Sequence, residues 1–281
     1  MSTVLDTLQK GTGYLEKYGV EDARLNMQHL LAHVLKCDRM QIYVDFDRQL
    51  TEPQLVTLRG LTKRRAGGEP LQHLLGTSEF CGLEFKTDDR ALIPRPETED
   101  LTERCSQLEL PGSPRILDLG CGSGVIGISL ASLLKENNPR ITLADVSQEA
   151  LDLAEENHRA LLPNSDIQLI RSDLFQNIEG TFDLIVANLP YIPKSEETTL
   201  SREVQRDPSL ALYGGEIGTE LIALFFDQVG SHIEPGGTVA LEYGINQEEE
   251  VKSLAENAQF EKVEIIKDLY GVNRFLFAVK I

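Results

Sequence analysis

The sequence is poor in cysteine and lacks any long apolar segment. Its four cysteines lie far apart, without a C-x-x-C pair, at positions 37, 81, 105 and 121, so neither a disulfide framework nor a zinc site is expected. No apolar run approaches the roughly 20 residues that span a bilayer. The start of the chain lacks the basic end and apolar core of a signal peptide. We therefore expect a cytoplasmic protein with no bound metal and no membrane partner.

Basic residues are scarce, and the deficit lies in one part of the chain. The net charge of the 281 residues is −18. Residues 1–75 hold ten Lys and Arg against nine Asp and Glu, whereas residues 76–281 hold 17 against 36. Affinity for nucleic acid rests largely on cationic contacts to phosphates. The acidic part of the chain therefore argues against a DNA or RNA substrate.

The chain length and the hydrophobic content of 41% predict two domains with buried cores, of which the first (residues 1–75) is helical. Apolar residues recur at three- and four-residue spacing over residues 23–35, which is typical of one amphipathic helix. Thr51 and Gln54 form the pattern of a capping box at the start of a second helix. The basic run 63–65 falls in the last turn of that helix, where it either complements the helix dipole or docks an acidic partner.

A short connector precedes a region in which strands and helices alternate. Gly82 suggests a hairpin, and Pro94 and Pro96 cannot continue a helix, so residues 76–96 are expected to link the domains. In residues 97–281 the expected strands are 115–119, 141–145, 167–170, 182–187, 237–242, about 262–267 and about 274–280, with helices over 125–134 and 150–160. This alternation predicts an α/β fold with a doubly wound, mostly parallel sheet and helices on both faces.

A glycine-rich loop joins the first of these strands to its helix. It reads Asp118-Leu119-Gly120-Cys121-Gly122-Ser123-Gly124, and its glycines let the backbone approach a ligand closely. Residues 122–127 also fit G-x-G-x-x-G, with Asp145 eighteen residues beyond them, so a dinucleotide-dependent dehydrogenase is a competing interpretation. The additional glycine Gly120 and the acid Asp118 before it favour S-adenosylmethionine instead.

Acidic residues stand at the carboxyl ends of three expected strands, where ligands of such sheets gather. Asp118 is expected either to receive the ammonium group of the ligand or to hold the loop. Asp145 is placed to accept hydrogen bonds from ribose hydroxyls, or alternatively to serve as a helix N-terminal acid near Ser147. Asp173 and Leu174 are expected to bind the adenine amino group and cover the ring, or else to form an ordinary turn.

The segment Asn188-Leu189-Pro190-Tyr191 follows the fourth expected strand. An amide nitrogen is a poor nucleophile, because its lone pair is delocalised into the carbonyl. The side-chain oxygen of Asn188 and the backbone carbonyl of Leu189 are a natural pair of acceptors for the two N–H groups of a substrate amide. Pro190 favours an extended conformation at Leu189, and Tyr191 offers a flat face for stacking. The segment therefore predicts methyl transfer to a planar nitrogen, achieved by positioning and preorganised electrostatics.

The chain resembles the release factor glutamine methyltransferases (the PrmC, or HemK, family) over essentially its whole length. The matching stretches are residues 69–76, 92–99, 118–124, 207–215 and 241–244, with Gln247, Gly271 and Arg274. The family's fold is a small helical domain joined through a β-hairpin to a seven-stranded class I S-adenosylmethionine-dependent methyltransferase domain. The resemblance implies methylation of the glutamine side chain in the Gly-Gly-Gln loop of peptide chain release factors.

The resemblance also implies roles for individual residues. The catalytic set that holds the substrate glutamine is Asn188, Leu189, Pro190 and Tyr191. The cofactor-binding set is Asp118, Gly120, Cys121, Gly122, Ser123, Gly124, Asp145, Asp173, Leu174 and Asn188. The helical domain, residues 1–75, would help to clamp the release factor. One departure from the family pattern Asn-Pro-Pro-Tyr is Leu189 in place of the first proline; the backbone carbonyl survives, but the rigidity of the ring is lost, so lower turnover with unchanged specificity is expected.

Two other functions remain open at the level of sequence. Methylation of an exocyclic amino group of adenine or guanine shares the logic of the Asn-x-Pro-aromatic segment, because the edge of a flipped base resembles an amide. A non-catalytic binder of release factors is the second alternative, with Leu189 as a sign of a decayed site. The acidic charge argues against the first, and the intact Asn188, Tyr191, Asp118 and glycines argue against the second.

Overall fold

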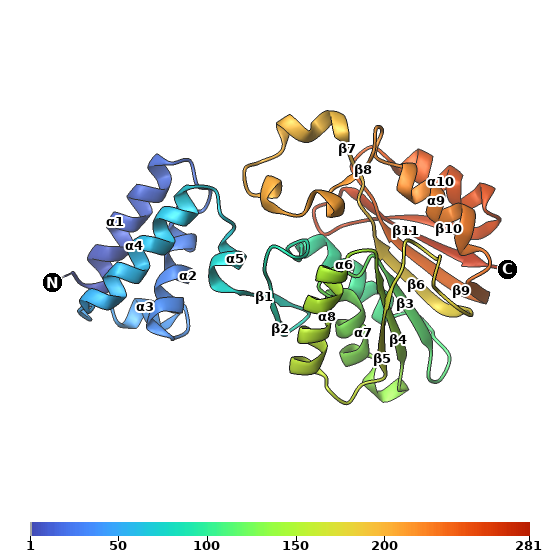
Figure 1. The fold of residues 1–281 in the computed structure, drawn as a ribbon, viewed down its shortest axis with the longest axis horizontal. Coiled ribbons are helices and arrows are strands. Elements are labelled where there is room, and N and C mark those ends of the chain that lie inside the picture. The colour runs from blue at the N-terminus through green and yellow to red at the C-terminus, as the bar shows by residue number, and fades with distance from the viewer. Residues whose placement is uncertain (1) are drawn as a thin grey trace. The chain divides into compact units, whose positions relative to one another are not determined.

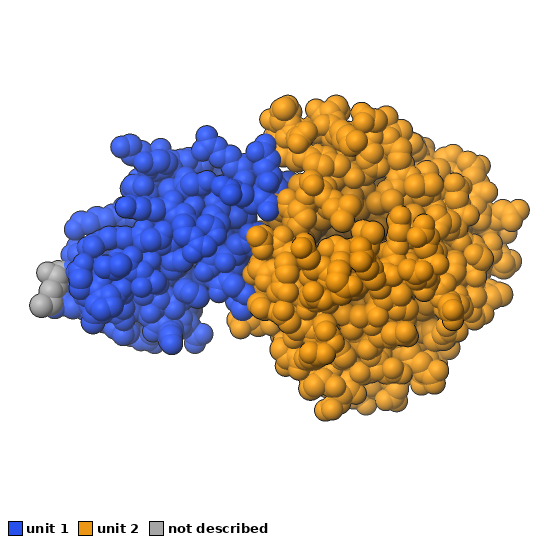
Figure 2. All heavy atoms as spheres, viewed as in Figure 1, with its two compact units in different colours: residues 1–77, 201–206 blue, residues 78–200, 207–281 orange. Residues whose placement is uncertain are grey.

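The structure, a computed structural model, describes residues 2–281 (Figure 1). The chain forms two compact units, which Figure 2 shows in different colours. Of the described residues, the first consists of 2–77 and 201–206, and the second of 78–200 and 207–281. No helix within residues 2–281 is long and apolar enough to cross a membrane.

The first unit is built from helices around an apolar core. Its helices are α1 (Val4–Lys17), α2 (Ala23–Leu35), α3 (Gln41–Val44), α4 (Glu52–Ala66) and α5 (Leu71–Leu75). Leu30 and Leu31 of α2 are fully buried in this core, which confirms the apolar stripe expected there. The expected capping box is present: the Gln54 side-chain oxygen accepts a hydrogen bond from the Thr51 backbone N–H at 3.0 Å.

The segment 201–206 belongs to this unit although it comes from far along the chain. Arg65, the last residue of the basic run in α4, is 3% exposed. Its guanidinium donates to Asn26 Oδ1 at 2.6 Å and to Glu203 Oε1 at 2.5 Å. A buried charge needs such partners to offset its desolvation. The run does lie in the last helical turn, as expected, but Arg65 has its acidic partner within the same chain, 138 residues away.

The second unit opens with a hairpin and continues as a seven-stranded sheet. The hairpin strands are β1 (Thr77–Phe80) and β2 (Leu83–Lys86). The sheet has the order β10-β11-β9-β6-β3-β4-β5. Its strands are β3 (Arg115–Leu119), β4 (Arg140–Asp145), β5 (Ile167–Arg171), β6 (Phe182–Asn188), β9 (Ile233–Glu242), β10 (Phe260–Lys267) and β11 (Asn273–Lys280). Only β11 runs antiparallel to its neighbours, so the expected mostly parallel sheet is confirmed.

Helices cover both faces of this sheet (Figure 1). One face packs against α6 (Pro96–Ser106), α7 (Val125–Leu133) and α8 (Gln148–Leu161), and the other against α9 (Glu220–Val229) and α10 (Glu248–Asn257). Successive residues of a strand point to opposite faces. Accordingly Leu184 and Val186 of β6 belong to the first core, whereas Ile185 and Ala187 belong to the second.

Two parts of the second unit differ from the sequence-based expectation. β9 begins at Ile233, four residues before the expected start, because its pairing with β6 continues across an irregularity near Gly236 and Gly237. The chain after β6 also forms a further two-stranded sheet, in which β7 (Ile192–Pro193) runs parallel to β8 (Tyr213–Gly215). Short 3₁₀ turns at Lys194–Thr199 and Ser209–Ala211 lie between these two strands.

Candidate functional site

The glycine loop and the Asn188 segment lie side by side at the carboxyl ends of two neighbouring central strands of the sheet. β3 and β6 are parallel neighbours, with Leu119 opposite Ala187, so the glycine loop and the Asn188 segment leave the sheet together. From β3 the chain proceeds to β4 and β5 on one side, whereas β6 and β9 lie on the other side. This reversal is the topological switch point at which doubly wound sheets bind their ligands.

The glycine loop is fixed to β4 and leaves one side open. The backbone N–H groups of Gly120 and Cys121 both donate to the carbonyl of Ala144, at 2.8 and 3.0 Å. Gly120 has φ +75°, a conformation that residues with a Cβ rarely adopt. Of the residues that the structure describes, a Cβ built on Gly122 would meet only Ala91, at 3.8 Å, so there is space beside the backbone at this position.

Asp118 and Asp145 shape this loop through backbone hydrogen bonds. Asp118 is fully buried, and its Oδ2 accepts from the Gly127 N–H at 2.9 Å. The other oxygen is buried without a hydrogen-bond partner among the described residues. Burial raises the pKa of Asp118 to about 7. Asp118 thus holds the loop through Gly127, which is one of the two roles expected for it.

Asp145 ends β4 and accepts two backbone hydrogen bonds of 2.9 Å, from Gly122 N–H to Oδ2 and from Ser147 N–H to Oδ1. Ser147 itself caps α8, since its side chain accepts from the Ala150 N–H at 3.2 Å. Each carboxylate oxygen of Asp145 keeps a further lone pair for another donor. Burial raises the pKa of Asp145 as well, and the backbone hydrogen bonds oppose that shift.

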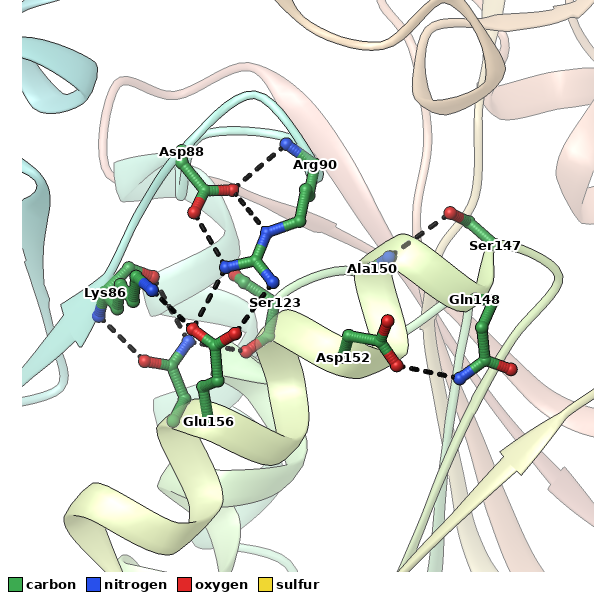
Figure 3. A network of polar contacts seen from close by, with 10 residues as sticks. Lys86, Asp88, Arg90, Ser123, Ser147, Gln148, Ala150, Asp152 and Glu156 are labelled. Atoms are coloured by element: carbon green, nitrogen blue, oxygen red, sulfur yellow. Dashed lines mark hydrogen bonds and ion pairs between the residues drawn. The ribbon is translucent and has the colours of Figure 1, made fainter.

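Asn157 is a loop-supporting residue that the sequence did not reveal. Its side-chain nitrogen donates to the Ser123 carbonyl at 3.0 Å, and its side-chain oxygen accepts from the Lys86 N–H at 2.7 Å. Figure 3 labels both partners, Ser123 and Lys86. Asn157 therefore joins α8, the glycine loop and the hairpin. Arg90 and Glu156 add an ion pair of 2.9 Å beside it. Asn157 lies in an ordinary amphipathic helix, so no local pattern distinguishes it.

The turn after β5 lies next to Asp145, at the carboxyl end of β4. The Ser172 N–H donates to the Asp145 carbonyl at 2.9 Å, and the Ser172 hydroxyl donates to the Leu174 carbonyl at 2.7 Å. Leu174 has φ +46°, which is rare for a bulky side chain. Asp173 is exposed and Leu174 is partly buried. Such strain persists only where the surroundings impose it, and it concentrates at functional sites.

The side chain of Leu189 packs against the glycine loop. Its side chain is 3% exposed and packs in the core with Ala187 and Leu119. A Cβ built on Gly120 would lie 3.1 Å from Leu189 Cδ2. The leucine therefore fills the space directly against the glycine loop.

Tyr191 is held at both of its polar groups. Its hydroxyl donates to Glu242 Oε1 at 3.2 Å, and its backbone carbonyl accepts from Gln247 Nε2 at 2.9 Å. The Gln247 side-chain oxygen in turn accepts from the Gly244 N–H at 2.8 Å. Burial and the neighbouring Glu242 raise the pKa of Tyr191, so it stays protonated at neutral pH. A neutral tyrosine whose hydroxyl and backbone carbonyl are both held suits stacking rather than proton transfer.

Asn188 is held by a residue from outside the motif. Its Nδ2 donates to Thr98 Oγ1 at 2.9 Å, and the Thr98 hydroxyl donates to Glu242 Oε2 at 2.7 Å. Thr98 lies in α6 and Glu242 ends β9. Both positions fall within the stretches that carry the family resemblance, but nothing in their spacing indicates that they meet Asn188.

Two further observations complete the site. Cys121 is buried, and its pKa is raised well above the ordinary value of a thiol by burial, so it is not available as a nucleophile. Arg95 pairs with the buried carboxylate of Asp207 at 2.6 Å, which fixes the start of α6 to the chain that follows Tyr191. Hydrogen bonds from within the second unit thus hold Asp118, Asp145 and Asn188.

Comparison with known proteins decides the family. The release factor glutamine methyltransferase of Rhodopirellula baltica is 36% identical over 283 residues, covering 98% of this chain and 95% of the relative. That of Geobacter sulfurreducens is 37% identical over 274 residues, covering 97% and 95%. The chain belongs to the release factor glutamine methyltransferase family. Residues 6–76 also match the family model of the PrmC N-terminal domain, and residues 104–217 match that of the methyltransferase small domain.

Solved structures agree on the fold. A methyltransferase from Pyrococcus furiosus matches with a TM-score of 0.54 at 22% identity, covering 71% of this chain and 89% of that chain. A T. thermophilus 16S rRNA methyltransferase, solved with AdoMet and guanosine, matches with a TM-score of 0.51 at 18% identity, covering 73% and 50%. At these identities the likeness shows the fold alone. The expected class I methyltransferase fold is confirmed.

Proposed function

We propose that this protein methylates the side-chain amide nitrogen of the glutamine in the Gly-Gly-Gln motif of peptide chain release factors, with S-adenosylmethionine as the methyl donor. The observation that supports the proposal is that Asn188 adjoins the glycine loop, since its backbone oxygen lies 3.9 Å from the Cβ position of Gly120, in a chain of this family. We place the reaction in the cytoplasm, because translation termination occurs there.

The residues around the glycine loop fit this cofactor. One buried oxygen of Asp118 has no hydrogen-bond partner within residues 2–281, which suits an ammonium group. The open side of Gly122 lets a ligand approach the backbone, and Asp145 has lone pairs to accept from ribose hydroxyls. Asp173 and Leu174, held in a strained turn, are assigned to the adenine. The cofactor supplies a methyl group on a positively charged sulfur.

The protein residues position the substrate amide. The Asn188 side-chain oxygen and the Leu189 carbonyl accept the two N–H groups of the glutamine, which aims the nitrogen lone pair at the methyl carbon. Tyr191 stacks on the plane of the amide. The reaction needs no nucleophile from the protein, in keeping with the buried thiol of Cys121. Rate acceleration comes from preorganised acceptors and orientation. Residues 1–75 are assigned to capture of the release factor.

Methyl transfer from labelled S-adenosylmethionine tests the proposal. The assay compares a purified release factor with a variant whose Gly-Gly-Gln glutamine is replaced. Label on the first and not on the second is the expected result. Label on neither, with cofactor binding demonstrated, would contradict the proposal and direct attention to exocyclic amino groups of nucleic acid, and then to a non-catalytic binder.

Asn188→Ala is the first mutation to make. We expect kcat to fall about 10²–10³-fold, because one preorganised polar group is lost from the site. The affinity for cofactor should change far less, since the glycine loop and Asp145 remain. Single-turnover methylation and calorimetric cofactor binding measure the two effects separately. A variant within about threefold of the parent rate would show that Asn188 does not orient the nucleophile.

A further inference from the structure

The Thr98 hydroxyl stands between Asn188 and a buried carboxylate. Thr98 is 4% exposed and Glu242 is 1% exposed. The chain of hydrogen bonds runs from Asn188 Nδ2 to Thr98 Oγ1, 2.9 Å, and from Thr98 Oγ1 to Glu242 Oε2, 2.7 Å. None of these three side chains is close to another in sequence, since 90 residues separate the first pair and 144 the second.

The chemistry of these groups gives the chain a direction. An ionised carboxylate can only accept hydrogen bonds, and a hydroxyl has a single proton to donate. When Thr98 donates that proton to Glu242, its oxygen can only accept from Asn188. The NH₂ group of the Asn188 amide must then face Thr98, and the amide oxygen must face away from it.

We propose that Thr98 and Glu242 are positioning residues that fix the rotation of the Asn188 amide, so that its oxygen is presented to the substrate nitrogen. This inference rests on the proposed function. If the amide were rotated by 180°, it would present its own NH₂ group to the NH₂ group of the substrate, and two donors cannot form a hydrogen bond.

The same carboxylate also holds the other end of the motif. Glu242 Oε1 accepts from the Tyr191 hydroxyl at 3.2 Å, so a single buried acid orients both the amide and the aromatic ring of the motif. Burial raises the pKa of Glu242 to about 7, while Thr98, Tyr191 and Arg274 stabilise the charged form and Glu97 opposes it. A protonated Glu242 would itself be a donor, and the direction of the Thr98 hydroxyl would no longer be imposed.

The decisive experiment compares three variants. Thr98→Val removes the hydroxyl at nearly constant volume, and Thr98→Ser retains it. Thr102→Val is the matched control: Thr102 is also fully buried in α6, but its hydroxyl donates to the Thr98 backbone carbonyl at 2.8 Å. We expect kcat of Thr98→Val to fall about tenfold or more, while KM and the cofactor Kd stay within about twofold. Thr98→Ser should stay within about threefold of the parent, as should the control.

Two kinetic results in the Thr98 variants would overturn the proposal. One is a parental kcat in Thr98→Val; the other is an equal loss in Thr98→Ser, which would point to packing rather than the hydroxyl. The pH dependence of kcat adds a further test, because a purely structural role of these residues would leave it unchanged. In the parent, kcat should rise with pH through about 7 as Glu242 ionises, and Glu242→Gln should remove this rise. An unchanged profile in Glu242→Gln would contradict the inference.

A measurement without substrate separates this inference from the proposed function. The side-chain NH₂ protons of Asn188, observed by ¹⁵N NMR, should exchange slowly in the parent and in Thr98→Ser, and faster in Thr98→Val. Slow exchange in a protein that transfers no methyl group to a release factor would refute the proposed function but support the hydrogen-bonded chain. Equal exchange in all three proteins would refute the chain itself.

Discussion

Leu189 shows how one residue adapts the motif. The family pattern has a proline at this position, and a leucine there was expected to cost rigidity. In the structure the leucine side chain is buried and lies against Gly120. The segment is thus held by packing where the proline ring would hold it by a fixed φ. Packing of this kind makes the fit between Leu189 and Gly120 a sensitive point of the site.

Gly120→Ala tests that fit. Gly120 combines φ +75° with a Cβ position 3.1 Å from Leu189 Cδ2. We expect the left-handed conformation to cost about 1–2 kcal/mol of unfolding free energy, and the displaced leucine to lower both cofactor affinity and kcat. Denaturant unfolding, calorimetry and methylation assays measure these effects.

Gly82→Ala is the matched control for the backbone strain. Gly82 in the hairpin turn has φ +72° with no neighbour within 4 Å of its Cβ position. The control should lose a similar free energy of unfolding, about 1–2 kcal/mol, and keep its cofactor affinity. If both variants bind cofactor as the parent does, the contact between Gly120 and Leu189 is not part of the site.

At the scale of elements, the chain after Tyr191 is attached at several points. β7 pairs with β8, Asp207 pairs with Arg95, and Glu203 pairs with the buried Arg65 of the first unit. Along the chain, the segment 201–206 of the first unit separates two stretches of the second unit, residues 78–200 and 207–281. If the first unit captures the release factor, as we propose, we expect this connectivity to couple capture to the chain that leaves the Asn188 motif.

Glu203→Gln tests this attachment. The ion pair with Arg65 is lost, while Arg65 keeps its bonds to Asn26 and to the Glu69 carbonyl. We expect faster amide hydrogen exchange in residues 201–206 and a KM for release factor raised about threefold or more, with an unchanged cofactor Kd. Glu196→Gln, which removes a charge from the same loop outside that ion pair, is the control. Parental exchange in residues 201–206 would show that the ion pair does not hold the segment.

At the scale of the whole molecule, the charge distribution sets the kind of partner. The acidic excess belongs to residues 76–281, whereas residues 1–75 are nearly neutral. An acidic surface attracts a basic protein and repels free polyanions. We therefore expect the release factor to meet this surface with a basic patch of its own.

The dependence of KM on ionic strength tests whether the acidic charge of residues 76–281 attracts the release factor. Screening shortens the reach of charges, with a Debye length of about 10 Å at 0.1 M salt. We expect KM for release factor to rise about threefold between roughly 50 and 300 mM salt. The cofactor Kd should stay nearly constant over the same range and serves as the control. A KM that falls with salt would mean that the two proteins repel one another.

Much of the fold was predictable from local patterns. The strands over residues 115–119 and 182–187 and the helices over 125–134 and 150–160 were expected to within about two residues at each end. Apolar runs and turn residues carry that information locally. The long β9 was less predictable, because Gly236 and Gly237 normally end a strand and here lie within an irregular one.

The site was predictable only where it is local in sequence. The glycine loop and the Asn188 segment can be recognised in the sequence, because their residues are only a few positions apart. Thr98, Glu242 and Asn157 are different, since each acts on a partner that lies at least 34 residues away. A threonine in a helix and a glutamate at a strand end have many ordinary uses, so their role depends on the packing of α6 and β9.

By itself the sequence determined the alternation of elements, the two motifs at strand ends and the acidic charge of the larger unit, because each depends on neighbouring residues or on composition. The tertiary structure decided which residues support those motifs. It placed Leu189 against Gly120, Thr98 between Asn188 and Glu242, and Glu203 on Arg65. The physical reason is that a buried polar or charged group must find its partner wherever the fold supplies one, and only the folded chain shows which segments meet.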